Sequence, residues 1–148
     1  MLWNGSVLEL VTARAAPRLG PDILGDPPDY ETMLARLRAG PQEREVGDAL
    51  LDQRLVAGIG NLWRAEALWE ARISPWRRLD ALDDGELLGV LQTAHRLMRA
   101  ALDAPRPPRN VYRRANRACP RCGAVVRSKP QGEHARTAYW CPGCQTEK

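Results

Sequence analysis

Apolar side chains recur at helical spacing through the first two thirds of the chain and predict a mainly helical protein. Asp29 can cap the first helix, in which Met33, Leu34 and Leu37 share one face. Asp83-Asp84-Gly85-Glu86 resembles a capping box and introduces the longest helix. We expect four helices: Tyr30 to about Ala39, about Gln42 to Asp52, Asn61 or Leu62 to about Ala71, and a helix after residue 83 that reaches about Leu102.

Short apolar runs near the two ends of the chain predict strands. Val7-Leu8-Glu9-Leu10-Val11 stands alone, and one strand cannot make a sheet, so it is either the edge of a sheet that lies elsewhere or a disordered leader. Ala124-Val125-Val126 and Ala138-Tyr139-Trp140 predict a hairpin. Pro105, Pro107 and Pro108 predict a stiff linker between the helices and this hairpin.

Charge divides the chain in the same place. Residues 1–104 contain 12 Arg against 16 Asp and Glu, a net charge of −4, whereas residues 105–148 carry +8, and the whole chain carries +4. A segment of this charge favours a polyanionic partner such as nucleic-acid phosphates over the alternative, a solvated basic tail. No apolar run is long enough to span a membrane, which leaves a globular protein that we expect in the cytoplasm.

The only cysteines form two Cys-x2-Cys pairs, Cys119 with Cys122 and Cys141 with Cys144. Each pair lets two thiolates reach one ion, so two pairs complete a tetrahedral shell. One structural zinc ion can replace a hydrophobic core that about 30 residues are too few to build. Two disulfides or a rubredoxin-like iron site are the alternatives, and the first residues show no secretory signal that would favour disulfides.

Gly58-Ile59-Gly60-Asn61 separates the second and third expected helices. The amides of a glycine-rich turn and the free N–H groups at a helix start form a site for an anion, and phosphate is a natural ligand. Asn61 adds a side-chain donor at the same place. The alternative is a helix cap that binds no ligand.

Two long motifs resemble the formamidopyrimidine-DNA glycosylase and endonuclease VIII family. Ala49-Leu50-Leu51-Asp52-Gln53, followed by Ala57-Gly58-Ile59-Gly60-Asn61-x-Trp63-x2-Glu66-x-Leu68, resembles its helix-two-turn-helix. The cysteine segment resembles its zinc finger, including Arg136-Thr137-Ala138-Tyr139-Trp140-Cys141-Pro142-Gly143-Cys144-Gln145. The resemblance covers about residues 30–146, and its ending is closer to the endonuclease VIII branch.

The resemblance implies a role in DNA base-excision repair. These enzymes remove oxidised bases, cut the abasic strand as lyases, and grip phosphates around a flipped nucleotide. The resemblance assigns phosphate contacts to Asn61 and Arg136. Gly58 and Gly60, from the glycine-rich turn, complete the expected DNA-binding residues, and the zinc ion is expected on Cys119, Cys122, Cys141 and Cys144. The partner it implies is damaged double-stranded DNA, and we expect a monomer without a membrane anchor.

The same resemblance leads us to expect no catalytic residue in this chain. Members of the family attack the sugar with an N-terminal proline followed by glutamate, whereas Met1 is followed by Leu2-Trp3. We expect residues 1–28 to be the end of a preceding β-rich domain and a linker, residues 29–104 a helical DNA-binding domain, residues 105–118 a linker and residues 119–146 the zinc finger. The chain alone is then inactive as a glycosylase.

Other titratable residues have simpler interpretations. Glu66 and Glu70 lie one helical turn apart and are expected on a solvated face or in ion pairs, not in acid–base catalysis. His95 is expected to pack or lie at the surface, and His134 at an exposed hairpin tip. Two further functions remain open at this stage: a non-catalytic DNA-binding module, and an RNA-binding zinc ribbon, against which the Gly58–Asn61 turn argues.

Overall fold

The computed structural model describes residues 19–104, 106–107 and 109–147. Its helices are α2 (Tyr30–Ala39), α3 (Val46–Leu50), α4 (Asn61–Glu70) and α5 (Asp84–Ala101), with a short 3-10 helix at Leu79–Ala81. The strands β1 (Arg127–Gln131) and β2 (Arg136–Trp140) form an antiparallel hairpin. The run Val7–Val11 lies outside the described residues. Among those residues, no helix is both long and apolar enough to cross a membrane.

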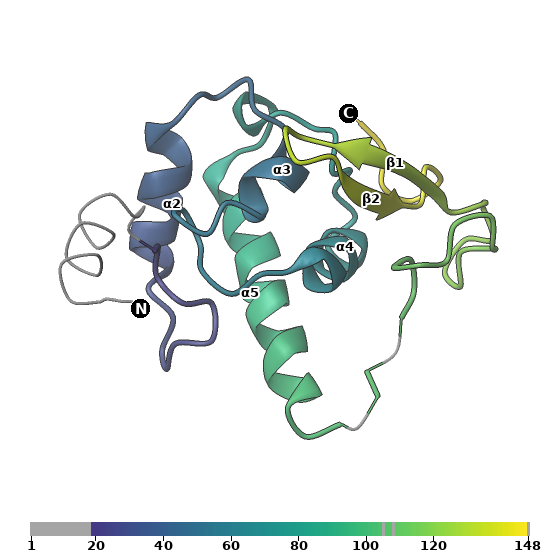
Figure 1. The fold of residues 1–148 in the computed structure, drawn as a ribbon, viewed down its shortest axis with the longest axis horizontal. Coiled ribbons are helices and arrows are strands. Elements are labelled where there is room, and N and C mark those ends of the chain that lie inside the picture. The colour runs from purple at the N-terminus through teal and green to yellow at the C-terminus, as the bar shows by residue number, and fades with distance from the viewer. Residues whose placement is uncertain (1–18, 105, 108, 148) are drawn as a thin grey trace, which may run out of the picture.

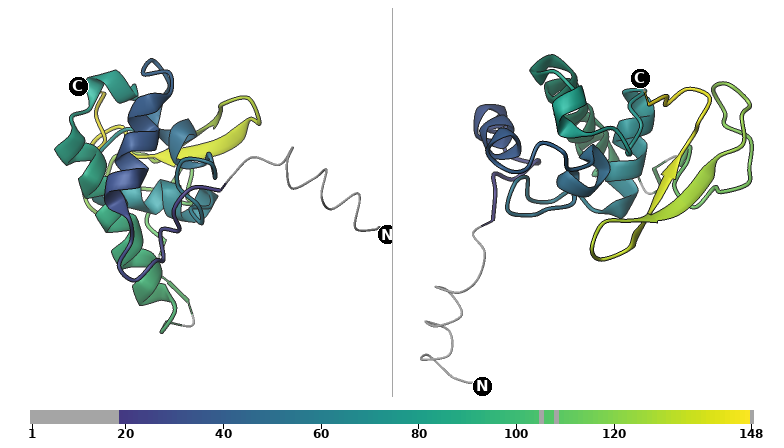
Figure 2. Two further views of the ribbon diagram at one scale, coloured as in Figure 1. Left: turned by 90° about the vertical axis from the view of Figure 1, so that its left-hand side faces the viewer. Right: turned by 90° about the horizontal axis from the view of Figure 1, so that it is seen from above.

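The long helix α5 runs between α2 and α4, and the hairpin lies beyond α4 (Figure 1). Seen from above, α2 and the hairpin stand at opposite sides of the described structure (Figure 2). The larger core lies among the helices and includes Met33, Leu37, Leu68 and Leu91. A smaller core joins Ala65 and Trp69 of α4 to residues around the cysteines. Helix α4 therefore contributes to both cores.

Local sequence signals place α2 and α5 as predicted. The Asp29 side chain accepts a hydrogen bond from the amide of Thr32 at the start of α2. The capping box at α5 is complete, because Asp83 accepts from the Glu86 amide and Glu86 accepts from the Asp83 amide. Both caps satisfy N–H groups that a helix start leaves without intrahelical partners.

The second expected helix is much shorter than predicted, Val46–Leu50 instead of about Gln42 to Asp52. Residues before it pair with a distant segment instead of winding into a helix. The amides of Leu79 and Asp80 donate to the carbonyls of Arg44 and Gln42, and Val46 donates to Arg77. These extended contacts satisfy the backbone groups that a longer helix would have used.

The first strand of the expected hairpin, Ala124-Val125-Val126, is also wrong, because β1 begins at Arg127, after Val126. Val125 forms a bridge with Ala118, and Val126 exchanges hydrogen bonds with Asn116 and Arg117. The apolar run therefore pairs with the segment before the cysteines. The hairpin is built from the polar sequence Arg127-Ser128-Lys129-Pro130-Gln131, which pairs with β2 from Arg127 opposite Trp140 to Gln131 opposite Arg136.

Candidate nucleic-acid interface and metal centre

The turn before α4 is held by Gln53. Its side-chain oxygen accepts from the Gly58 amide at 2.7 Å, and its side-chain amide donates to the Ile59 carbonyl at 3.0 Å. Gly58 has a φ of +103°, a conformation that glycine adopts without strain. Gly60, by contrast, has an extended backbone, and a Cβ placed there would meet no atom of the described residues within 4 Å. The backbone at Gly60 is therefore open to a ligand.

Asn61 begins α4 and joins the turn to the hairpin. Among the described residues, no side chain caps this helix. The Asn61 amide nitrogen Nδ2 donates to the Thr137 carbonyl at 2.9 Å, and Oδ1 accepts from Arg64. A carboxamide NH₂ has two protons, so one donor of Asn61 is left beyond the bond to Thr137.

Arg64 lies beneath Asn61 and is 1% exposed. Its guanidinium donates to the Gly47 and Thr137 carbonyls and to the side-chain oxygens of Asn61 and Gln131. None of these acceptors carries a charge, and Arg64 forms no salt bridge within the described structure. Burial, and then the positive charge of Arg136, lower the pKa of Arg64 to about 10, while Asp48 acts in the opposite direction. The place where Asn61 and Arg64 meet the hairpin at Thr137, here called the junction, therefore has a positive potential that suits an anion.

Arg136 is the first residue of β2 and is exposed. It immediately precedes Thr137, whose carbonyl accepts from both Asn61 and Arg64. The structure thus holds the Asn61 side chain against the backbone next to Arg136, although the two residues come from the turn and from the hairpin. The hairpin tip is seated on α3: Gly132 has a φ of +77°, and a Cβ there would collide with the Asp48 carboxylate.

The four cysteines gather at the open end of the hairpin, opposite its tip, with all four Sγ atoms within 4.8 Å of one another. The Sγ atoms of Cys119 and Cys144 are 3.9 Å apart, and those of Cys122 and Cys141 are 3.4 Å apart. All four thiols are free. A tetrahedral zinc–thiolate centre with bonds of about 2.3 Å has sulfur–sulfur edges of about 3.8 Å. The donor set and its spacing therefore fit one tetrahedral metal ion and not two disulfides.

Glu66 contradicts the expectation of a solvated face, because it is 2% exposed. Its carboxylate accepts from the backbone amides of Asn110, Val111 and Tyr112 and from the Asn110 side chain, at 2.9–3.0 Å. Four charge-assisted donors make Glu66 the anchor of the segment before the first cysteine. Glu70 meets the expectation, since it is partly exposed and lies 3.3 Å from Arg96 in an ion pair.

The two histidines also lie as expected. The Nδ1 atom of His95 is 2.8 Å from the Ile23 carbonyl oxygen, and its ring packs edge-on against Tyr30. His134 is exposed near the hairpin tip and does not belong to the cysteine cluster.

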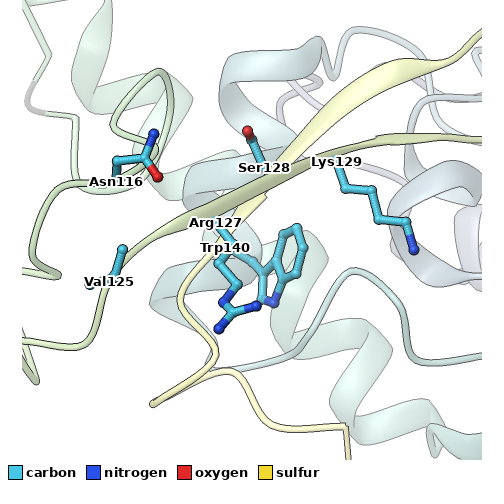
Figure 3. A pocket seen from close by; sticks show the side chains of 6 residues that line it. All are labelled: Asn116, Val125, Arg127, Ser128, Lys129 and Trp140. Carbon is cyan, nitrogen blue, oxygen red and sulfur yellow. The ribbon is translucent and has the colours of Figure 1, made fainter.

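A hollow of about 550 Å³ lies on the hairpin, and Asn61 is not among its lining residues. In Figure 3, Arg127, Lys129 and Trp140 lie on one side of the strand pair, and Ser128 projects to the other side. Asn116 and Val125 complete the lining. Its cations, Arg127 and Lys129, form no ion pair within the described structure. The described lining of the hollow offers positive charge but no carboxylate or histidine.

Three residues of these sites were not singled out as site residues from the sequence. Gln53 and Glu66 lie inside the helix-two-turn-helix motif, and that position was the available signal for both. Arg64 gave none, because an arginine between two apolar helix positions resembles an ordinary surface residue. Its burial follows only from the hairpin that covers it.

Comparisons with known proteins agree with this architecture. The formamidopyrimidine-DNA glycosylase H2TH domain family matches residues 19–107. A "Probable endonuclease 8 2" of Streptomyces coelicolor is 41% identical over 144 residues, which cover 89% of this chain and 51% of that protein. The "Endonuclease 8" of Klebsiella pneumoniae is 31% identical over 163 residues, which cover 98% of this chain and 61% of that protein. The chain thus spans about half to three fifths of these relatives.

Solved structures show the same fold. The Lactococcus lactis formamidopyrimidine-DNA glycosylase, non-covalently bound to DNA containing an AP site, matches with a TM-score of 0.78 and 24% identity, over 97% of this chain and 56% of that one. The MutM (Fpg) protein of Thermus thermophilus matches with a TM-score of 0.77 and 28% identity, over 98% of this chain and 59% of that one. Since the H2TH family covers well over half of its residues, the chain belongs to the formamidopyrimidine-DNA glycosylase and endonuclease VIII family.

Proposed function

We propose that the described part of the chain grips damaged duplex DNA as the binding portion of a base-excision-repair glycosylase and AP lyase. One observation carries this proposal: the Asn61 side chain bonds the backbone of Thr137, the residue that follows Arg136, beside a buried arginine that has no anionic partner in the described residues. Phosphate oxygens would supply the missing negative charge. Base extrusion costs a few kcal/mol, and a firm grip on flanking phosphates helps to offset it.

The individual roles follow from the geometry of each donor. Arg136 offers a planar fork of N–H groups that matches two phosphate oxygens. Asn61 offers its remaining amide proton, and the backbone at Gly60 lets a phosphate approach the start of α4. Gly58 keeps the turn in the left-handed conformation that places these groups together.

Cys119, Cys122, Cys141 and Cys144 would hold one zinc ion as a structural staple. Bound zinc supplies no reaction chemistry here; it fixes the hairpin that carries Arg136. Metal analysis of the purified protein should give one zinc per chain. Cys141→Ser should abolish zinc binding and disorder the hairpin. The far-ultraviolet circular dichroism spectrum should keep its helical signal, because the larger core contains none of the cysteines.

The DNA proposal is tested by fluorescence anisotropy with a duplex that contains a tetrahydrofuran abasic analogue. The wild-type chain should bind with a strong salt dependence and only a weak preference over undamaged duplex. Arg136→Ala should weaken binding and flatten the slope of log K against log salt by about 0.9 for each lost phosphate contact. Asn61→Ala should also weaken binding, and the double variant should be weaker than either.

Arg127→Ala is the matched control, because Arg127 is an exposed hairpin arginine outside the junction. It should change affinity less than Arg136→Ala does. Equal effects of the two arginine variants would show that only net charge matters and would contradict the assigned roles. Tighter binding to RNA of the same sequence would contradict the DNA proposal.

A further inference from the structure

Trp69 of α4 contacts the cysteine cluster directly. The residue is 8% exposed, and its indole nitrogen Nε1 donates to the Cys119 sulfur at 3.3 Å. The indole N–H is a donor only, and a buried tryptophan usually satisfies it. Here the acceptor is one of the four candidate metal ligands, and it lies fifty residues away in sequence.

Arg121 provides a second link between α4 and the sulfurs. It lies between Cys119 and Cys122, and its guanidinium carbon is 3.9 Å from the centre of the Trp69 ring. Its Nη2 atom donates to the Trp69 carbonyl at 2.6 Å and to the Cys144 sulfur at 3.0 Å. One guanidinium therefore joins the helix to a cysteine of the opposite pair.

The negative charge of a metal bound by four thiolates explains why these donors would matter. Four thiolates around a divalent ion carry a net charge of −2. Donors around the ligands stabilise that charge and hold each sulfur in position, and removal of such outer groups typically lowers metal affinity by about 10–100-fold. Arg121 adds a positively charged donor that compensates part of this charge, and Trp69 adds a neutral donor.

We propose that Trp69 and Arg121 are positioning residues of the metal centre, so that α4 contributes to metal retention. This inference rests on the proposed zinc site. The metal and the helix that begins at Asn61 then form one coupled unit, in which loss of the ion releases the four sulfurs from one another and so weakens the contacts that hold the cysteines against α4.

Trp69→Phe tests the inference with the smallest change, because it keeps an aromatic ring beneath Arg121 and deletes the N–H group. Arg121→Lys keeps the charge and deletes the fork. Trp63→Phe is the control on the same helix, since Trp63 packs against the larger core. Zinc affinity is measured by competition with a chromophoric chelator, and cobalt(II) is substituted to read the sulfur-to-metal charge-transfer band.

We expect Trp69→Phe and Arg121→Lys each to weaken zinc binding by about tenfold or more, with Trp63→Phe unchanged. Loss of a donor raises the energy of the sulfur lone pairs, so the cobalt band should move to longer wavelength in the two test variants only. Wild-type affinity and an unshifted band in both test variants would overturn the inference and leave the zinc site standing. A wild-type protein that binds neither zinc nor cobalt would contradict both.

Discussion

The side-chain nitrogen Nδ2 of Asn61 lies 2.9 Å from the Thr137 carbonyl oxygen, a contact between residues 76 positions apart. The contact ties the start of α4 to the strand that carries Arg136. Arg64 reinforces it by donating to both residues. The two groups proposed to bind phosphate are therefore held in register by the protein itself, which reduces the ordering that DNA binding would require.

Asn61→Asp tests the polarity of this junction. The fold should lose about 1–2 kcal/mol, because a carboxylate oxygen replaces the Nδ2 donor that faces the Thr137 carbonyl, an effect that pairing with Arg64 partly offsets. A carboxylate repels phosphate, so affinity for duplex DNA should fall by more than about tenfold and further than in Asn61→Ala. Chemical denaturation and anisotropy measure the two effects. Affinity equal to that of Asn61→Ala would show that no phosphate approaches this position.

The two glycines of the turn should respond differently to substitution. Gly58→Ala should lower the free energy of unfolding by about 1–2 kcal/mol, because a φ of +103° is unfavourable for alanine. Gly60→Ala should leave stability nearly unchanged, because its Cβ meets open space. If a phosphate lies against this backbone, Gly60→Ala should still weaken DNA binding by roughly tenfold, the loss of about one charge-assisted hydrogen bond. Unchanged binding would exclude Gly60 from the interface.

Glu66→Gln should lower the free energy of unfolding by about 3 kcal/mol, because it removes a buried charge and turns an NH₂ group toward backbone donors. Glu70→Gln is the matched control one helical turn away. Its side chain is 41% exposed, so its loss should change stability by less than about 0.5 kcal/mol. Urea denaturation measures both variants, and equal effects would show that the Glu66 contacts contribute little.

Asp52 makes stability depend on pH. Hydrogen bonds from Arg54 hold the pKa of its carboxyl below the usual value against the opposing effect of burial, and Arg44 lowers it further. The carboxylate therefore stabilises the fold at neutral pH, and this contribution declines as the pH falls below about 4, where the unfolded carboxyl takes up a proton first. Asp52→Asn should cost about 1–2 kcal/mol at pH 7. The difference from wild type should shrink in urea titrations at lower pH; a constant difference would contradict the ion pairs.

Elements with local signals were predictable from the sequence. Asp29 and the Asp83–Glu86 box locate two helices because a cap and its helix are adjacent in the chain. The paired spacing of the cysteines likewise indicates a shared site, since each pair needs only a short turn.

Features that depend on distant partners were not predictable. The strand Arg127–Gln131 has no apolar alternation and forms because Arg136–Trp140 lies beside it. Glu66 is buried because residues 110–112 fold back onto it, and Arg64 because the hairpin covers it. In each case the side chain gains partners that no local pattern encodes.

Helix α4 limits how the protein can be divided. Within ten residues it presents Asn61 to the junction, Glu66 to the segment before the cysteines and Trp69 to a sulfur. A fragment that starts at Cys119 would keep every metal ligand but lose the carboxylate that anchors its approach and the indole that packs in its core. The smallest transplantable unit with the cysteine centre therefore begins at or before α4, so the finger is not a separable cassette.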